Sequence, residues 1–175
     1  MMIKKLAIVV SVIGLLSLGA VFIYGASKGQ LNSDFEIIIK ADQNTVWGNF
    51  QNPGKFKKWM SGFEKIEMIE GIPGTEGSTY ALHFINEDGS SNVLNQKLTS
   101  IDAPNSISFD LNNEMFSSTL LITLQEVNDG TKMSVTMSTE GSNPFYNAFI
   151  HLGKEKIDQN QRQNYEAFKQ LLEQE

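Results

Sequence analysis

Hydrophobic and polar residues alternate along most of the chain after residue 33. In residues 34–40, Phe35, Ile37 and Ile39 recur at every second position, which is the period of a half-buried strand. A similar period recurs in residues 65–72, 80–85, 93–101, 107–111, 116–124 and 132–138. Turn-forming residues separate the segments, as at Asn128–Gly130. Evenly spaced short strands joined by such turns predict an antiparallel sheet.

Helical spacing replaces the alternation in two places. Residues 41–60 predict two short helices, with Asp42 capping the first and Asn52-Pro53 ending it and starting the second. From Asn143 onward the chain predicts a long amphipathic helix that can bend or restart at Gly153. Its apolar positions are Phe145, Phe149, Leu152, Ile157, Tyr165, Phe168, Leu171 and Leu172.

The N-terminus carries an uncharged apolar run, Leu6–Tyr24, of 19 residues. A helix of that length spans roughly 28 Å, close to the hydrocarbon thickness of a bilayer. The run predicts a retained membrane anchor, and Lys4 and Lys5 place the N-terminus in the cytoplasm and the domain outside it. The alternative is a cleaved signal peptide and a secreted domain, although a cut after Ala26 leaves bulky Tyr24 three residues back.

The predicted organisation has three parts. Residues 1–26 form the anchor or signal segment, residues 27–33 form a polar linker, and residues 34–175 form one globular domain. The two basic residues of the first segment leave 12 Lys and Arg against 20 Asp and Glu in the remainder. An acidic domain without a basic stripe argues against nucleic acid as a partner, because phosphate neutralisation supplies most of that affinity.

The sequence contains no recognisable catalytic or metal-binding signature. It has no cysteine, so disulfides, thiolate metal sites and a cysteine nucleophile are excluded. Its two histidines, His83 and His151, lack metal-ligand spacing, and no nucleophile elbow, phosphate loop or dinucleotide fingerprint occurs. We therefore predict no catalytic residue, no metal and no cofactor.

The segment from the end of the first strand to the following hairpin resembles the START/Bet v 1-like (SRPBCC) superfamily. Within it, the chain is most similar to bacterial polyketide cyclase/dehydrase-type proteins. The resemblance rests on Ala41, the Val46-Trp47 helix, Pro53-x-x-Phe56-x-x-Trp59 and Gly74-x-x-Gly77. It implies an α+β helix-grip fold: a curved antiparallel sheet wrapped around the long C-terminal helix, with an apolar cavity between them. It also implies that Trp59 and Met60 lie at the cavity entrance.

The predicted function is membrane-tethered, non-catalytic binding of a hydrophobic small molecule or lipid in that cavity. Gln161 falls on the inward stripe of the long helix, where a ligand cavity tolerates a polar residue and a dry core does not. Face alternation and the resemblance together give the candidate lining residues Trp59, Phe84, Leu94, Phe109, Ile122, Met137, Phe149, Gln161 and Tyr165.

Two other functions remain open at this point. One is a cyclase or dehydratase-type enzyme acting on an apolar substrate in the same cavity, for which His83, Tyr80 and Gln161 are the available acid, base or polar groups. The other is a protein-interaction module. An enzyme would need a polar pair inside the cavity, whereas an interaction module needs no cavity.

Overall fold

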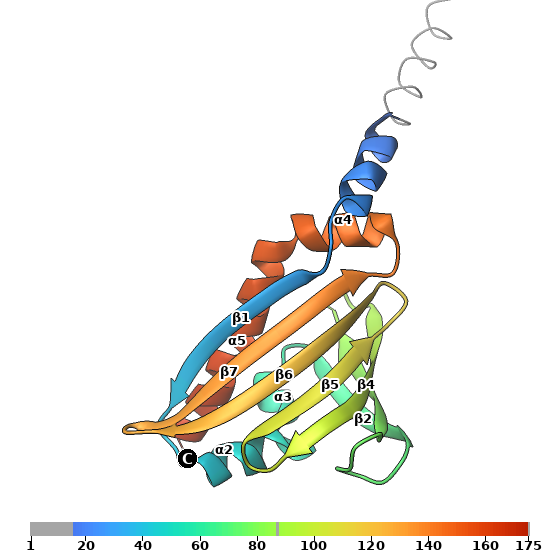
Figure 1. Cartoon of the computed structure of the whole chain (residues 1–175). Coiled ribbons are helices and arrows are strands. Elements are labelled where there is room, and N and C mark those ends of the chain that lie inside the picture. Colours follow the sequence, from blue (N-terminus) through green and yellow to red (C-terminus); the bar gives the residue numbers. More distant parts are fainter. Residues whose placement is uncertain (1–15, 87, 175) are drawn as a thin grey trace, which may run out of the picture.

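The computed structural model describes residues 16–86 and 88–174, and its centre is one curved antiparallel sheet (Figure 1). Seven strands lie in the order β1-β7-β6-β5-β4-β3-β2. Consecutive strands from β2 to β7 are neighbours, so that part is a simple meander. The strands are β1 (Leu31–Ile39), β2 (Phe63–Glu70), β3 (Thr79–Ile85), β4 (Ser91–Asp102), β5 (Ser106–Asn112), β6 (Phe116–Val127) and β7 (Gly130–Gly141).

The first strand completes the sheet by pairing with the last. β1 runs antiparallel to β7, from Leu31 opposite Thr139 to Ile39 opposite Thr131. The strand begins at Leu31, inside the segment 27–33 that the sequence predicts as a linker. Its buried residues alternate strictly with exposed ones, as expected for a strand with one face on the core.

Two short helices follow β1, as predicted. α2 (Gln43–Phe50) begins after Asp42, whose carboxylate accepts a hydrogen bond from the Thr45 backbone N–H at 2.9 Å. Asn52 starts the next turn by accepting from the Gly54 N–H at 3.0 Å, with a proline at the first helical position. That 3₁₀ turn, η1 (Pro53–Lys55), leads directly into α3 (Phe56–Trp59).

The predicted C-terminal helix is two helices. α4 (Pro144–Leu152) is capped by Asn143, and α5 (Lys154–Glu173) begins directly after Gly153. Figure 1 shows α5 running along the concave face of the sheet while α4 lies across its end. The α+β helix-grip architecture predicted from the sequence is therefore confirmed, with a break where the glycine lies.

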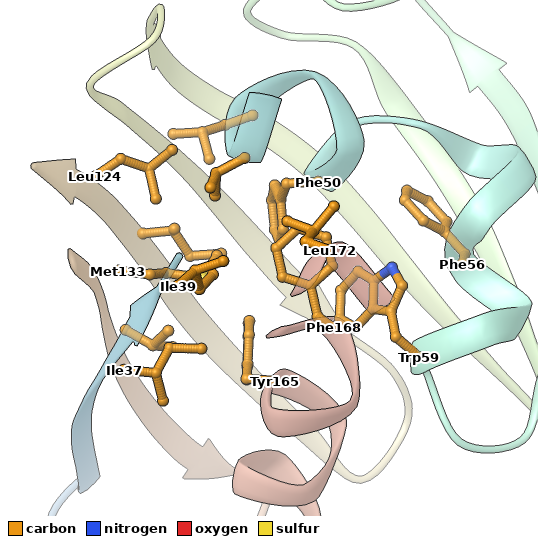
Figure 2. Packing of buried hydrophobic residues seen from close by; sticks show 14 of the residues in the cluster. Ile37, Ile39, Phe50, Phe56, Trp59, Leu124, Met133, Tyr165, Phe168 and Leu172 are labelled. Carbon is orange, nitrogen blue, oxygen red and sulfur yellow. The ribbon is translucent and has the colours of Figure 1, made fainter. Parts of the chain in front are cut away.

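At one end of the molecule, a tightly packed core fills the space between the concave face of the sheet and the helices α2 and α5 (Figure 2). Side chains from β1, α2, β6, β7 and α5 meet there and exclude solvent almost completely. Six of them are at most 1% exposed: Ile39, Val46, Ile122, Met133, Val135 and Phe168. Burial of such side chains supplies most of the stabilisation of a domain of this size.

The N-terminal segment corrects a prediction. Residues 16–26 are helical and end against α4, where the rings of Phe22 and Phe145 lie 5.3 Å apart and Asn147 Nδ2 donates to the Gly25 carbonyl at 3.0 Å. No helix within residues 16–86 and 88–174 is both long enough and apolar enough to cross a membrane.

The predicted localisation as a single-pass membrane protein with an extracytoplasmic domain is contradicted by this finding. Within the predicted Leu6–Tyr24 span, the structure describes residues 16–24, which are helical. The rest of that span, residues 6–15, lies outside the described residues.

Candidate ligand cavity

A partly open cavity of about 740 Å³ lies between the concave face of the sheet and the helices α3 and α5. Every strand contributes at least one side chain to its wall, and the loop after β2 contributes Pro73 and Gly74. The volume falls within the range of small-molecule binding sites. The wall is overwhelmingly apolar, so the cavity suits a hydrophobic occupant.

Most of the predicted lining residues lie on the cavity wall, and those on strands follow the alternation. On β3, Tyr80, Leu82 and Phe84 face the cavity, while His83 points to the other face of the sheet. Seven of the nine candidates line the cavity: Trp59, Phe84, Leu94, Phe109, Met137, Gln161 and Tyr165. Their contact with a ligand remains a prediction.

Two candidates lie elsewhere. Ile122 faces inward but is only 1% exposed, because α2 covers this end of β6 and leaves no space beside it. Phe149 is 61% exposed, and its neighbour Ile150 lines the cavity instead. The break at Gly153 explains this difference, since α4 does not continue the line of α5 and presents another face to the sheet.

Aromatic rings surround Trp59 at the α3 side of the cavity. Its ring centroid lies 5.7 Å from that of Phe50, 5.9 Å from Phe56, 5.8 Å from Tyr165 and 5.2 Å from Phe168 (Figure 2). Burial raises the pKa of the Tyr165 phenol well above its ordinary value, so the hydroxyl stays protonated at physiological pH. The indole Nε1 of Trp59 is buried and has no hydrogen-bond partner within the described part of the chain.

Polar side chains form a smaller group on β6, β7 and α5. Ser118 Oγ and Thr139 Oγ1 lie 2.7 Å apart and share a hydrogen bond, and Gln161 Nε2 lies 3.5 Å from Met137 Sδ. Sequence reasoning missed Ser118 and Thr139, although both continue the inward alternation of their strands, two residues before Leu120 and two after Met137. That alternation was the signal that could have found them.

A hydrogen bond to a carboxylate joins α5 to β1 beside this polar group. The hydroxyl group of the cavity-lining Ser33 donates a hydrogen bond to the Asp158 carboxylate. The same carboxylate forms an ion pair with Lys154. Burial alone would raise the pKa of Asp158. The hydrogen bonds from Lys154 and Ser33 and the charges of Lys154 and Arg162 outweigh it and hold that pKa below the ordinary 3.8.

The candidate catalytic groups are not brought together. His83 Nε2 lies 2.7 Å from Glu67 Oε2, without hydrogen-bond alignment, on the face of the sheet away from the cavity. Tyr80 lines the cavity, but its hydroxyl oxygen accepts from the Gly74 N–H at 2.9 Å. In the part of the chain that the structure describes, no cluster of three or more His, Cys, Asp or Glu residues could hold a metal ion.

Comparison with known proteins identifies the family. The sequence model described as polyketide cyclase/dehydrase and lipid transport matches residues 30–173, so the chain belongs to that family. The match confirms the resemblance to the START/Bet v 1-like superfamily. Among curated proteins, no sequence matches the chain significantly.

Solved structures share the fold at low sequence identity. Protein CV1439 from Chromobacterium violaceum is 17% identical, with a TM-score of 0.66 over 82% of this chain and 98% of that one. Ara h 8.0201 is 15% identical, with a TM-score of 0.68 over 84% and 100%. The di-domain ARO/CYC protein StfQ of the steffimycin biosynthetic pathway is 9% identical, with a TM-score of 0.67 over 83% and 51%. These likenesses concern the fold alone.

Proposed function

We propose that this domain binds a hydrophobic small molecule or lipid in the cavity and does not transform it. The observation that carries the proposal is the cavity itself, about 740 Å³ in volume and walled almost entirely by apolar side chains. A void of that size in a domain core forfeits packing contacts unless an occupant restores them. The family description, which includes lipid transport, agrees with such a role.

The second candidate is a cyclase or dehydratase acting on an apolar substrate in the same cavity. It is favoured by the family description and by the presence of Tyr80 and Gln161 in the wall. It is weakened by the position of His83 on the far face, because no histidine, the usual general acid or base, is among the described residues that line the cavity.

The test is binding of N-phenyl-1-naphthylamine, an uncharged dye whose fluorescence rises in apolar surroundings, to the full chain. We expect saturable binding with a dissociation constant in the micromolar range, on the order of −8 kcal/mol. Met137→Trp should fill the cavity and abolish the signal. Met68→Trp, at a 41% exposed position on β2, is the matched control and should bind normally. Failure of the unaltered chain to bind the dye saturably would overturn the proposal.

A further inference from the structure

We propose that the ligand of this cavity is an uncharged amphiphile with a hydroxyl group, and that the hydroxyl binds at one polar patch of the wall. The patch consists of Ser118 on β6, Thr139 on β7 and Gln161 on α5. The inference rests on the proposed function, because it specifies the chemistry and the orientation of the ligand. Three observations support it: the position of the patch, its unused hydrogen-bonding groups and the absence of charge in the wall.

The strand register and the facing helix bring the polar patch together. Ser118 lies opposite Thr139, and both line the cavity. Gln161 reaches the same region from α5, because its Nε2 lies 3.5 Å from the sulfur of Met137, two residues before Thr139 on the same face of β7. Side chains from a strand pair and from the helix across the cavity therefore border the same part of the space.

Next to the patch, the wall is hydrocarbon. One apolar side chain from each of the strands β4 to β7 lies opposite the next, and all line the cavity: Leu98, Phe109, Leu120 and Met137. Ser33 continues this row on β1, but its hydroxyl is already bonded to the Asp158 carboxylate. A ligand with its polar group at the patch can therefore place its hydrocarbon part along this row.

The polar patch has unused hydrogen-bonding groups. The hydroxyls of Ser118 and Thr139 lie 2.7 Å apart, so one proton is shared between them, and no described residue accepts the other. The Gln161 amide makes a single hydrogen bond among the described residues, to the Met137 thioether, which is a weak acceptor. The patch can thus donate one hydrogen bond from the hydroxyl pair and accept another at Gln161 Oε1.

An alcohol matches this combination of donor and acceptor. Its oxygen can accept from the hydroxyl pair while its proton is donated to Gln161 Oε1. Water that reaches the patch makes the same bonds, so a ligand that displaces the water without replacing them leaves polar groups unpaired, which is unfavourable. An ether replaces only one of the two bonds, and a hydrocarbon replaces neither.

The wall offers no partner to an ionised headgroup. Across residues 16–86 and 88–174, no Asp, Glu, Lys, Arg or His side chain lines the cavity. Asp158 lies next to the wall, but its charge is offset by Lys154 and by the nearby Arg162. A carboxylate or phosphate entering the cavity would lose its hydration without gaining a counter-ion. The charge distribution therefore selects an uncharged ligand.

The experiment compares three ligands as competitors of N-phenyl-1-naphthylamine bound to the full chain, at about pH 8, where carboxylic acids are ionised. They are 1-decanol, its isomer methyl nonyl ether, which accepts a hydrogen bond but cannot donate one, and decanoate, which is charged. We expect 1-decanol to compete about fivefold better than the ether, as one additional hydrogen bond supports. It should compete at least about tenfold better than decanoate.

Gln161→Leu tests the assigned acceptor, because it removes the amide at a half-buried helix position and keeps a side chain of similar size. The preference for 1-decanol over the ether should fall below about twofold, while the dye still binds. Gln163→Leu is the matched control, at an exposed position of α5 outside the cavity wall, and should keep the preference. Gln96→Leu removes another amide of the wall, on β4 two strands away from Ser118, and should keep it too.

A double variant tests the hydroxyl pair. Ser118→Ala with Thr139→Val removes both hydroxyls, so neither is left unpaired. Binding of 1-decanol and of the ether should weaken alike, by about threefold or more, since both ligands accept from the pair. The control is Ser108→Ala with Thr99→Val, which removes a hydroxyl pair 2.8 Å apart outside the cavity wall and should change neither affinity.

A spectroscopic arm uses the unaltered chain and does not depend on the folding of a variant. With threonine methyl groups labelled with ¹³C, the Thr139 methyl should show nuclear Overhauser effects to the CH₂OH protons of 1-decanol and not to its terminal methyl. The Thr99 methyl should show neither.

Four results would overturn the inference and leave the carrier function standing. They are equal competition by the ether or by decanoate, a preference that survives Gln161→Leu, loss of the preference in Gln96→Leu, and contact of Thr139 with the terminal methyl of 1-decanol instead of its CH₂OH group. Absence of dye binding by the unaltered chain would overturn both.

Discussion

The two ends of the same sheet differ sharply in how they are filled. On β7, Met133 is fully buried, whereas Met137, four residues later on the same face, borders the cavity. On α5, Phe168 is fully buried, whereas Gln161, two turns earlier on the same stripe, also borders the cavity. One end is a dry core and the other is hollow, although one strand and one helix serve both.

The difference comes from the element that covers each end. At the packed end, α2 inserts Val46 and Phe50, and Gln43 closes the layer by donating to Asn105 Oδ1 at 3.1 Å and to the Leu124 carbonyl at 3.2 Å. At the hollow end, the corresponding cover is α4, much of whose apolar surface faces outward: Phe149 is 61% exposed and Leu152 66%. The concave face of the sheet forms a packed core only where a helix places apolar side chains against it.

Truncation at the packed end should produce the largest effect. Phe168→Ala removes a fully buried ring that packs on Phe50 and Trp59, and should lower the free energy of unfolding by about 3–5 kcal/mol. Gln161→Ala, on the same stripe at the hollow end, should change it by less than about 1 kcal/mol. Chemical denaturation measures both, and equal losses would mean that the two ends are packed alike.

Replacing a methionine with the larger tryptophan should also destabilise the packed end more than the hollow end, but by less than the truncation of Phe168 does. Met133→Trp overfills a closed site and should cost about 1–3 kcal/mol. Met137→Trp places the same side chain in the cavity and should leave the free energy of unfolding within about 1 kcal/mol, because the space is already there. Thermal unfolding of the two variants compares them directly, and a large loss in Met137→Trp would argue against the cavity.

Acid should weaken the polar attachment at the hollow end by a modest amount. Because the pKa of Asp158 is lowered in the folded state, its contribution is complete at neutral pH and disappears as the pH falls below about 4 through the folded-state pKa. In unfolding experiments across that range, Asp158→Asn should reduce the pH dependence of stability. Asp34→Asn, an exposed position on β1, is the control and should lose less of it. Identical pH profiles for Asp158→Asn and the unaltered chain would mean that Asp158 contributes no acid-sensitive stabilisation.

The sequence predicts which face of each strand points to the concave side of the sheet. It does not predict which residues on that face lie in the packed core and which border the cavity. Period-two alternation was enough to place Phe84, Leu94 and Met137 on the concave side. It could not separate Ile122 from Leu120, since both share that face and only the position of α2 decides which is enclosed. Gln161 was recognised because a polar residue interrupted an apolar stripe.

Other misses have equally local causes. Phe149 shares the helical spacing of the apolar positions in α5, which predicts it in the cavity, but the break at Gly153 turns it outward. In α2 the adjacent apolar residues Val46 and Trp47 also differ: Val46 is buried, as are Gln43 and Phe50, whereas Trp47 is half-buried. In an eight-residue helix, a shift of one position in phase is enough to exchange such neighbours.

The pairing of β1 with β7 has a consequence for biosynthesis. The strand that ends at Ile39 has no partner until Thr131 and its neighbours have been made. At roughly 5–20 residues per second, the ribosome leaves it waiting on the order of ten seconds. Throughout that time, Phe35, Ile37 and Ile39 present an apolar strand with free backbone groups, the kind of surface that pairs with other chains. During synthesis, β1 is therefore the segment that most needs shielding from pairing with other chains, and this need arises before the residues that form the cavity have all been made.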